Sequence, residues 1–311
     1  MKRVIFIGGT SYSGSTFINL MLGNAPDAFS CGEVSFYFRP IKQKYLNPDC
    51  SCGNPDCTVW PQLKSKGEAN LYENIFKMFP HINTIVDSSK NPLWINDMTR
   101  NLKDSGIACK NLLIWKSPEE FRLSRAKRGR EHGWRRAWIN YHRSYFLLVK
   151  DFTIVKYSEI AKNPGLLKPL CDCLDIPYHE EQDHYWEKIH HSLYGNSSAN
   201  IHLHQQNSNA FSHYEKEIKD TWKNYGFQEN EHQAIKYDSQ ETEQAKVNSE
   251  IEKDELVERI VAFLESRDFQ KHPGHERDNL MESEIDHLKA LKIWPMLQRA
   301  HYFMQTMAIN H

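Results

Sequence analysis

The sequence lacks the features that mark several broad classes of protein. Its formal net charge is −1 over 311 residues, so no overall basic field favours nucleic acid or an anionic membrane as a partner. No apolar run approaches the ~20 residues that a membrane-spanning helix needs. Met1, Lys2 and Arg3 lead directly into a short apolar run and not into a secretory signal segment. We therefore expect a cytoplasmic protein that neither spans a membrane nor binds nucleic acid.

The first residues form a strand, a glycine-rich turn and a helix. Residues 4–7 are an apolar run that is long enough for one buried strand, and Gly8 and Gly9 end it. Apolar residues at helical spacing follow between Gly14 and Gly23. Backbone N–H groups and the positive end of the helix dipole make such a turn a site for an anion, most often a phosphate.

The spacing of this turn is that of the ATP/GTP phosphate loop, but the lysine of that loop is missing. Gly9 and Gly14 are separated by four residues and are followed by Ser15 and Thr16. Ser15 occupies the position of the lysine that neutralises the β- and γ-phosphates. The replacement favours a ligand with less charge at this position and disfavours ordinary ATP hydrolysis. A turn that binds nothing is the alternative that the loop alone leaves open.

Apolar runs and helical patterns alternate along the first part of the chain. Such alternation is typical of a parallel sheet with helices on both faces. It predicts the α/β class, with a P-loop-like central parallel sheet flanked by helices, an irregular cover segment and C-terminal helices. After the first strand and helix, the expected strands are residues 29–34, 82–86, 112–115 and 152–157, and the expected helices are 71–79, 118–128, 134–149 and 164–174.

The expected organisation is one core with appended segments. Residues 1–204 form the α/β core, in which the proline-rich residues 37–66 are an irregular cover over the loop. Residues 205–253 are mostly polar and are expected to be an insert or linker. Residues 254–311 are expected to pack on or beside the core. The helical patterns there cover residues 255–264 and about 279–306.

Polar and basic residues follow the later strands at a spacing that points to a family. Lys90 ends a polar strand terminus, and Lys116 and Ser124 stand eight residues apart in a strongly basic region. Together with the loop, these features resemble the sulfotransferases that use 3′-phosphoadenosine-5′-phosphosulfate (PAPS). The resemblance covers roughly residues 1–200. It is strongest to bacterial sulfotransferases and extends at several points to tyrosylprotein sulfotransferases.

The resemblance implies that the loop holds the 5′-phosphosulfate of the cofactor PAPS. The implied loop residues are Tyr12, Ser13, Gly14, Ser15, Thr16 and Phe17. Tyr12 occupies a position at which the family usually has Lys or Arg. A phenol donates a hydrogen bond but brings no positive charge, so the cation near the transferred group must come from elsewhere.

The resemblance also implies a site for the 3′-phosphate. Lys116 and Ser124 match an Arg and a Ser of the family, and lysine binds phosphate as a point charge. Arg125 and Arg128 are expected to help, and Tyr157 is expected near the adenine. Without the resemblance, Ser124 and the basic residues would be a solvated helix face, and Tyr157 a core aromatic residue.

Two residues are implied to act on the transferred group. Glu33 lies in a Cys-Gly-Glu segment that resembles the one in tyrosylprotein sulfotransferases, where the glutamate is the proposed base. Lys90 matches a lysine of that family near the transferred group, and it could neutralise the leaving oxygen. The alternatives are an exposed loop glutamate and a lysine in solvent.

The cysteines and one histidine leave several interpretations open. Cys50, Cys52 and Cys57 could be reduced loop thiols, could form a disulfide, or could bind zinc with Cys31 as the required fourth ligand. The segment from His191 to Asn196 resembles one that follows the core in bacterial relatives, where it could cover the cofactor. The resemblance implies no metal, and we expect none.

The sequence thus predicts an enzyme that transfers a sulfuryl group from PAPS to a hydroxyl of an acceptor, with Glu33 as general base. One alternative is a P-loop kinase or nucleotide hydrolase, which would need a replacement for the missing lysine and Mg²⁺ ligands such as Thr16 and Asp87. Another is a non-catalytic protein that binds 3′-phosphoadenosine nucleotides. The sequence does not identify the acceptor, and a homo-oligomer is possible.

Overall fold

The computed structural model describes residues 1–203, 216, 220 and 244–267. Its centre is a five-stranded sheet with the order β2-β3-β1-β4-β5, in which every pairing is parallel. The strands are β1 (Arg3–Gly8), β2 (Ala28–Gly32), β3 (Thr84–Lys90), β4 (Ala108–Trp115) and β5 (Phe152–Lys156). The predicted α/β fold is confirmed, and the strand that precedes the glycine-rich turn lies at the middle of the sheet.

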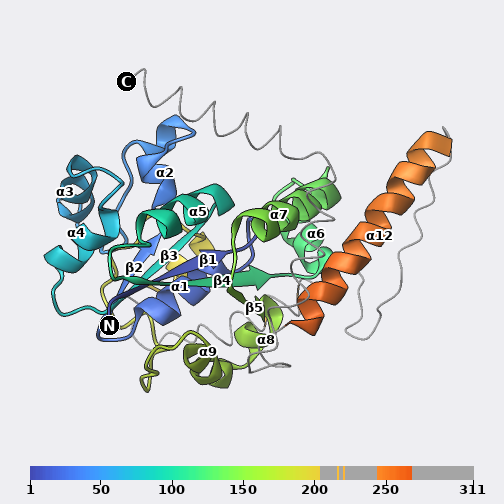
Figure 1. Cartoon of the computed structure of the whole chain (residues 1–311). Helices are drawn as coiled ribbons and strands as arrows, with labels where there is room; N and C mark the ends of the chain where they lie inside the picture. Colours follow the sequence, from blue (N-terminus) through green and yellow to red (C-terminus); the bar gives the residue numbers. More distant parts are fainter. Residues whose placement is uncertain (204–215, 217–219, 221–243, 268–311) are drawn as a thin grey trace.

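Helices cover both faces of this sheet (Figure 1). One face carries α1 (Ser15–Gly23), α8 (Tyr157–Lys162) and α9 (Leu167–Cys173). The other carries α3 (Val59–Ser65), α4 (Leu71–Met78), α5 (Pro92–Asn101), α7 (Trp134–Leu148) and α12 (Gln244–Ser266). Further helices in the described part of the chain are α2 (Ser35–Phe38), α6 (Pro118–Ala126), α10 (Ser197–Asn200) and the short 3₁₀ turns Gln43–Tyr45 and Pro164–Leu166.

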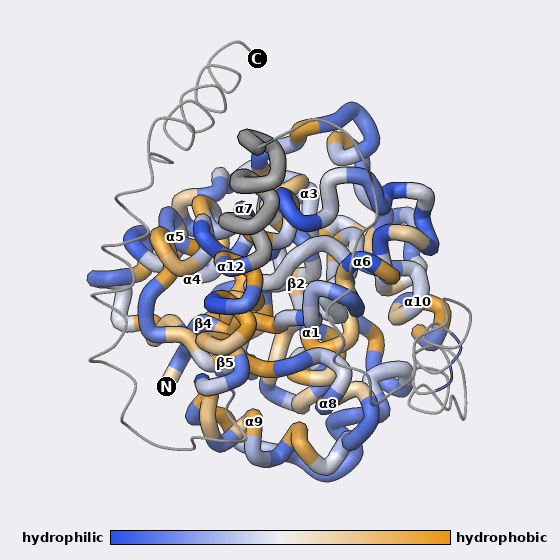
Figure 2. The backbone as a smooth tube through the Cα atoms, turned by 90° about the vertical axis from the view of Figure 1, so that its right-hand side faces the viewer, coloured by the Kyte–Doolittle hydropathy of each residue, from blue (hydrophilic) through white to orange (hydrophobic). Residues whose placement is uncertain are grey.

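The central strand is buried on both faces, as a parallel sheet requires. Val4 and Phe6 belong to one hydrophobic cluster, whereas Ile5 and Ile7 belong to the other, because successive side chains of a strand point to opposite faces. Figure 2 shows hydrophobic segments gathered around β4, β5 and α1. Alternation within a continuous apolar run thus fills two cores at once.

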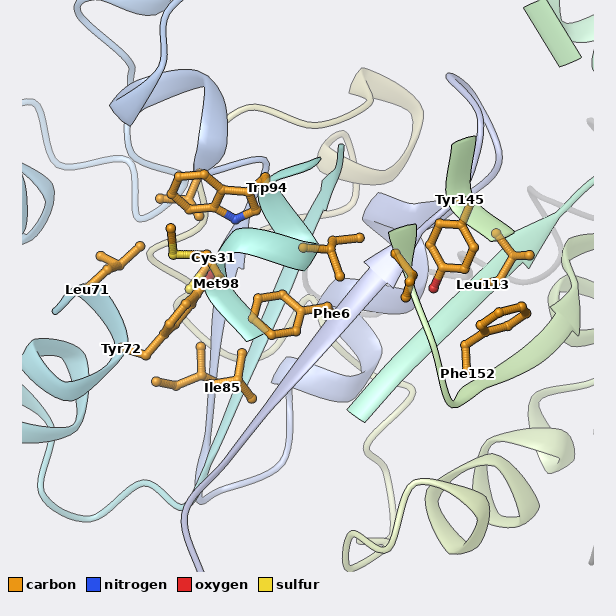
Figure 3. Close-up of a cluster of buried hydrophobic side chains, with 14 of the residues drawn as sticks. Phe6, Cys31, Leu71, Tyr72, Ile85, Trp94, Met98, Leu113, Tyr145 and Phe152 are labelled. Atoms are coloured by element: carbon orange, nitrogen blue, oxygen red, sulfur yellow. The ribbon is translucent and has the colours of Figure 1, made fainter. Parts of the chain in front are cut away.

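The larger cluster surrounds Phe6 (Figure 3). The ring of Tyr72 meets Phe6 edge-on, with centroids 5.5 Å apart. Tyr72 also donates to Asp87 Oδ2 at 2.6 Å, and Trp94 Nε1 donates to the same oxygen at 2.9 Å. The backbone N–H of Ser89 donates to Oδ1 at 2.7 Å. The buried carboxylate therefore has three donors, which offset the cost of removing it from water.

The structure corrects the expected cover segment, part of which is helical. Residues 59–65, placed inside the irregular range 37–66, form α3, and residues 35–38 form α2. Trp60 and Leu63 of α3 are buried in the larger cluster. They are three residues apart and therefore lie on one face of a single helical turn. This segment is too short for its periodicity to stand out among the prolines of the sequence.

Two helix starts also differ from the expected ones. No helix was expected at residues 92–101, yet Asn91 caps α5 by accepting from the N–H of Leu93 at 3.0 Å, and Pro92 occupies the first turn. Tyr157 was expected to end a strand, but β5 stops at Lys156 and Tyr157 begins α8.

The helix expected at 255–264 begins earlier, at Gln244, within the predicted linker. Ile260 and Leu264 are buried against the core, and Phe263 packs edge-on against Phe146 of α7 with centroids 5.1 Å apart. This part of the chain packs on the core as expected. The rest of the predicted linker, apart from residues 216 and 220, and the predicted helix at about 279–306 lie outside the described residues. None of the helices within the described ranges is both long and apolar enough to cross a bilayer.

His142 is a buried polar residue of α7. It is fully buried, and its Nδ1 donates to the carbonyl oxygen of Trp138 at 2.8 Å. The two rings are packed with centroids 4.1 Å apart. Burial lowers the pKa of His142 to about 4, so the folded protein holds this imidazole neutral.

This burial predicts an acid-sensitive contribution to stability. An unfolded histidine gains a proton near pH 6.5, whereas the folded one stays neutral down to about pH 4. The contribution is therefore complete above about pH 6.5 and is lost as the pH falls towards 4, by roughly 3 kcal/mol. We expect the free energy of unfolding of the wild type to fall by that much more than that of His142→Phe, measured by urea titration at pH 7 and pH 4. His81→Phe, at an exposed histidine, should follow the wild type, and equal losses in the wild type and His142→Phe would contradict the prediction.

Candidate functional site

The glycine-rich turn joins β1 to α1 at the carboxyl edge of the sheet. Gly14 is the residue before α1 and has φ 91° and ψ 8°, in the left-handed region that favours glycine. Among the described residues, no side chain caps the first turn of α1. Ser15 and Thr16 are buried there. The turn thus has the local form of an anion site.

Gly14 is required for a second reason, which is the close approach of Tyr157. A Cβ on Gly14 would lie 2.0 Å from Cδ2 of the Tyr157 ring. The ammonium of Lys116 lies over the same ring, 4.4 Å from its centroid. Lys116 Nζ also donates to Ser124 Oγ at 3.1 Å. The structure therefore brings together the loop, the lysine and serine implied for the 3′-phosphate, and the tyrosine implied for the adenine.

Tyr12 brings no charge to the loop, but two guanidinium groups lie against it. Arg128 stacks over the Tyr12 ring at 4.0 Å, and Arg130 Nη1 donates to the Tyr12 hydroxyl at 3.1 Å. Arg128 also donates to the carbonyl oxygen of Ser124 at 2.7 Å. The phenol of Tyr12 thus contacts two guanidinium cations, at the position where the sulfotransferases that the sequence resembles usually have Lys or Arg. Arg130 was not predicted as a site residue, because its contact with Tyr12 joins positions 118 apart in the sequence.

Arg125 donates to backbone carbonyls of the segment after α6. Its Nε donates to the carbonyl oxygen of Arg130 at 2.6 Å, and its Nη2 to that of His132 at 3.3 Å. These contacts hold the segment after α6 in the conformation that presents Arg130 to Tyr12. A direct contact of Arg125 with a cofactor stays a prediction.

Glu33 and Lys90 form an ion pair, although they come from different strand ends. Their side chains are 15% and 14% exposed, so water screens the pair only in part. Lys90 has φ 63°, an uncommon conformation for a residue with a side chain. The resemblance implied that these two residues act on one group, and the structure places them in contact.

Tyr141 connects this ion pair to the loop. Its hydroxyl accepts from the N–H of Gly9 at 2.5 Å and donates to the carbonyl oxygen of Lys90 at 2.7 Å. Burial raises the pKa of Tyr141, so the phenol keeps the proton that it donates. Its role as a bridge depends on helix α7 crossing the ends of β1 and β3, which no local pattern indicates.

The segment from His191 to Asn196 also contacts the loop, at Thr16. The N–H of Asn196 donates to Thr16 Oγ1 at 2.9 Å, and a Cβ on Gly195 would lie 2.8 Å from Thr16 Cγ2. Leu193 pairs with the Glu33 segment, because its N–H donates to Cys31 at 2.9 Å and its carbonyl accepts from Glu33 at 2.8 Å. His191 itself lies beside Cys50 and Cys57.

Comparison with known proteins finds no matching family model and no matching curated protein. Among solved structures, the chain is similar to a sulfotransferase domain from the curacin biosynthetic pathway, with 15% identity, a TM-score of 0.48 and coverage of 73% of this chain and 99% of that one. It is also similar to a sulfotransferase domain from the Synechococcus PCC 7002 olefin synthase, with 13% identity, a TM-score of 0.49 and coverage of 84% and 94%. At such identities and TM-scores the likeness carries no argument about the chemistry of this chain.

The contact between Gly14 and Tyr157 predicts the effect of adding one methyl group. Gly14→Ala should lower the free energy of unfolding by more than the ~1 to 3 kcal/mol that a side chain costs at such a φ, because the methyl group overlaps the ring. Gly106→Ala is the matched control, since Gly106 has φ 74° and no described atom lies within 4 Å of the position that an added methyl group would occupy. Equal losses for the two variants in urea titrations would show that the ring does not restrict Gly14.

Proposed function

We propose that this protein is a sulfotransferase that uses PAPS as the donor and a hydroxyl group as the acceptor. The observation that supports it is the convergence of two anion sites on the ring of Tyr157. The loop glycine touches one part of this ring, and Lys116, paired with Ser124, lies over it. A nucleotide with phosphates on both its 5′ and 3′ positions needs two such sites beside an aromatic surface.

The arrangement also disfavours the kinase-like alternative. That alternative required Thr16 and Asp87 as Mg²⁺ ligands. Both oxygens of Asp87 accept hydrogen bonds inside the core, from Tyr72, Trp94 and Ser89. Thr16 Oγ1 accepts from Asn196. Mg²⁺ is bound by oxygen ligands in octahedral geometry. The oxygens of the buried Asp87 already accept hydrogen bonds within the core and are not directed to a site for such an ion.

In the proposed reaction, bound PAPS supplies the sulfuryl group and a phosphate leaving group. The oxygen of the acceptor hydroxyl forms a bond to sulfur while the bond from sulfur to the 5′-phosphate oxygen breaks. Glu33 takes the hydroxyl proton, and Lys90 neutralises the charge on the departing oxygen. The ion pair between the two residues holds the Glu33 carboxylate beside the Lys90 ammonium. Most of the rate enhancement would then come from positioning and electrostatics.

Arg128 and Arg130 compensate for Tyr12 in this proposal. They bring positive charge to the loop position at which the family usually has a basic side chain. An arginine stacked on a phenol keeps its donors directed to the ring edge, where an anion can accept them. The function of the missing cation is thus assigned to residues that are more than a hundred positions away in the sequence.

The proposal predicts a preference among nucleotides. At ~100 times its Kd, 3′-phosphoadenosine-5′-phosphate should stabilise the protein by about 2.7 kcal/mol, whereas ADP and ATP–Mg²⁺ should do much less. Lys116→Met should weaken this binding by about tenfold or more, since it removes a charged partner of the 3′-phosphate. Calorimetry and thermal shift measure both effects, with Lys127→Met, exposed in the same basic region, as the control. Tighter binding of ATP–Mg²⁺ would overturn the assignment.

The role of Glu33 predicts a separation of binding from turnover. Glu33→Gln should bind 3′-phosphoadenosine-5′-phosphate as the wild type does, but should transfer sulfuryl groups about 10²- to 10⁴-fold more slowly. Transfer is measured from radiolabelled PAPS to a panel of sugars, phenols, peptides and alcohols. Glu180→Gln, at an exposed carboxylate, should retain the wild-type rate. Normal turnover in Glu33→Gln would exclude the base, and nucleotide binding without transfer to any acceptor would favour a non-catalytic binding protein.

A further inference from the structure

Three cysteines and one histidine form a cluster that the proposed reaction does not use. Cys50, Cys52 and Cys57 come from the cover segment. His191 comes from the segment His191 to Asn196, which contacts the loop. Their sulfur and nitrogen atoms all lie within 4.8 Å of one another, and all four residues are half-buried. From the sequence, a zinc site would need Cys31 as its fourth ligand. In the structure Cys31 is fully buried in the larger hydrophobic cluster, and His191 is the fourth residue beside the three cysteines.

The distances match those between ligands of one tetrahedral zinc ion. Zn–S bonds of about 2.3 Å and a Zn–N bond of about 2.0 Å at tetrahedral angles place sulfur and nitrogen about 3.5 Å apart. The Sγ atoms of Cys50 and Cys57 lie 3.4 and 3.5 Å from Nδ1 of His191. Three thiolates and one imidazole are a frequent ligand set of structural zinc sites.

Hydrogen bonding alone accounts poorly for this geometry. A neutral imidazole nitrogen has a single lone pair, so Nδ1 of His191 can accept one S–H group. Two sulfur atoms nevertheless approach it at nearly equal distances, and the third thiol, of Cys52, lies in the same cluster. A cation at the common centre of the four atoms would satisfy all of them.

The backbone around the cluster is held in place by its own hydrogen bonds. Ser51 Oγ donates to the carbonyl oxygen of His190 at 2.8 Å and accepts from the N–H of Ser192 at 2.9 Å. The N–H of Ser51 donates to the carbonyl oxygen of Ser192 at 3.0 Å. Trp60 Nε1 donates to the carbonyl oxygen of His191. Residues on both sides of the candidate ligands are therefore positioned without a metal, as a preformed site requires.

We propose that Cys50, Cys52, Cys57 and His191 bind one structural zinc ion. The ion would join the cover segment to the segment from His191 to Asn196. Four protein ligands complete a tetrahedral shell, so the ion has no open position for a substrate. Two residues beyond His191, the backbone of Leu193 pairs with Cys31 and Glu33. Asn196 of the same segment donates to Thr16 of the loop. The ion would thus hold the backbone that positions Glu33 and the loop.

This site does not depend on the proposed sulfotransferase activity, so it is tested without an activity assay. The full chain is purified under reducing conditions without a histidine tag, and its metal content is measured by inductively coupled plasma mass spectrometry. We expect about one zinc ion per chain. Cys57→Ser and His191→Ala should lose it, whereas Cys109→Ser and His81→Ala, outside the cluster, should keep it. Removal of zinc by a chelator should lower the melting temperature of the wild type, and added Zn²⁺ should restore it.

A measurement on the wild type covers the case in which a variant fails to fold. After exchange of the metal for Co²⁺, tetrahedral sulfur ligation should give strong visible d–d bands and a near-ultraviolet sulfur-to-cobalt charge-transfer band. A wild-type chain that contains no zinc and gains none from added Zn²⁺ would overturn the proposal. So would a disulfide between two of the three cysteines, seen as a loss of two hydrogen masses in the intact protein. Zinc that stays bound in well-folded Cys57→Ser and His191→Ala would place the ion elsewhere.

Discussion

The ring of Tyr157 occupies the space that a side chain at Gly14 would need, and the arrangement of the site depends on this contact. It fixes the start of α8 against the start of α1, at the edge where β1 and β5 end. The same ring lies beneath the ammonium of Lys116. One aromatic side chain thus contacts both the loop and the lysine. In the proposed function, the separation between these two groups decides which nucleotides can bind both. A smaller residue in place of Tyr157 would remove this contact with the loop and with Lys116.

The loop itself is held from two further directions by groups far away in the sequence. Tyr141 hydrogen-bonds Gly9 on one side and the carbonyl of Lys90 on the other. Asn196 hydrogen-bonds Thr16 from the opposite end. Such contacts restrict the loop before any ligand arrives, so less conformational entropy is lost on binding. The backbone of Lys90 accepts from Tyr141, and the backbone of Glu33 donates to Leu193 of the segment that contains Asn196. Both members of the ion pair are thus tied to these supports.

In the proposed function, the positive charge that the loop lacks is supplied by another element. A basic residue in the loop would place its cation there directly. Here the loop provides a phenol, and the segment after α6 provides Arg128 and Arg130, which contact the ring and its hydroxyl. Arg125 holds this segment through the carbonyls of Arg130 and His132. The positive charge beside the loop therefore depends on the conformation of a second segment. A lysine in the loop itself would not depend on that segment.

The sequence by itself determined the features that depend on near neighbours. The strand, glycine turn and helix at the start of the chain and the alternation that predicts a parallel sheet rest on residues a few positions apart, whose spacing sets their geometry. The pairing of Lys116 with Ser124 was implied only by the resemblance to sulfotransferases. Short helices such as α3 were not predicted, because a single turn of buried residues gives little periodic signal in the sequence. Only the tertiary structure decided which distant groups meet: Tyr12 with Arg130, separated by 118 positions, and Cys57 with His191, separated by 134. The path of the chain over the sheet creates these contacts, and that path depends on packing between helices that no local pattern specifies.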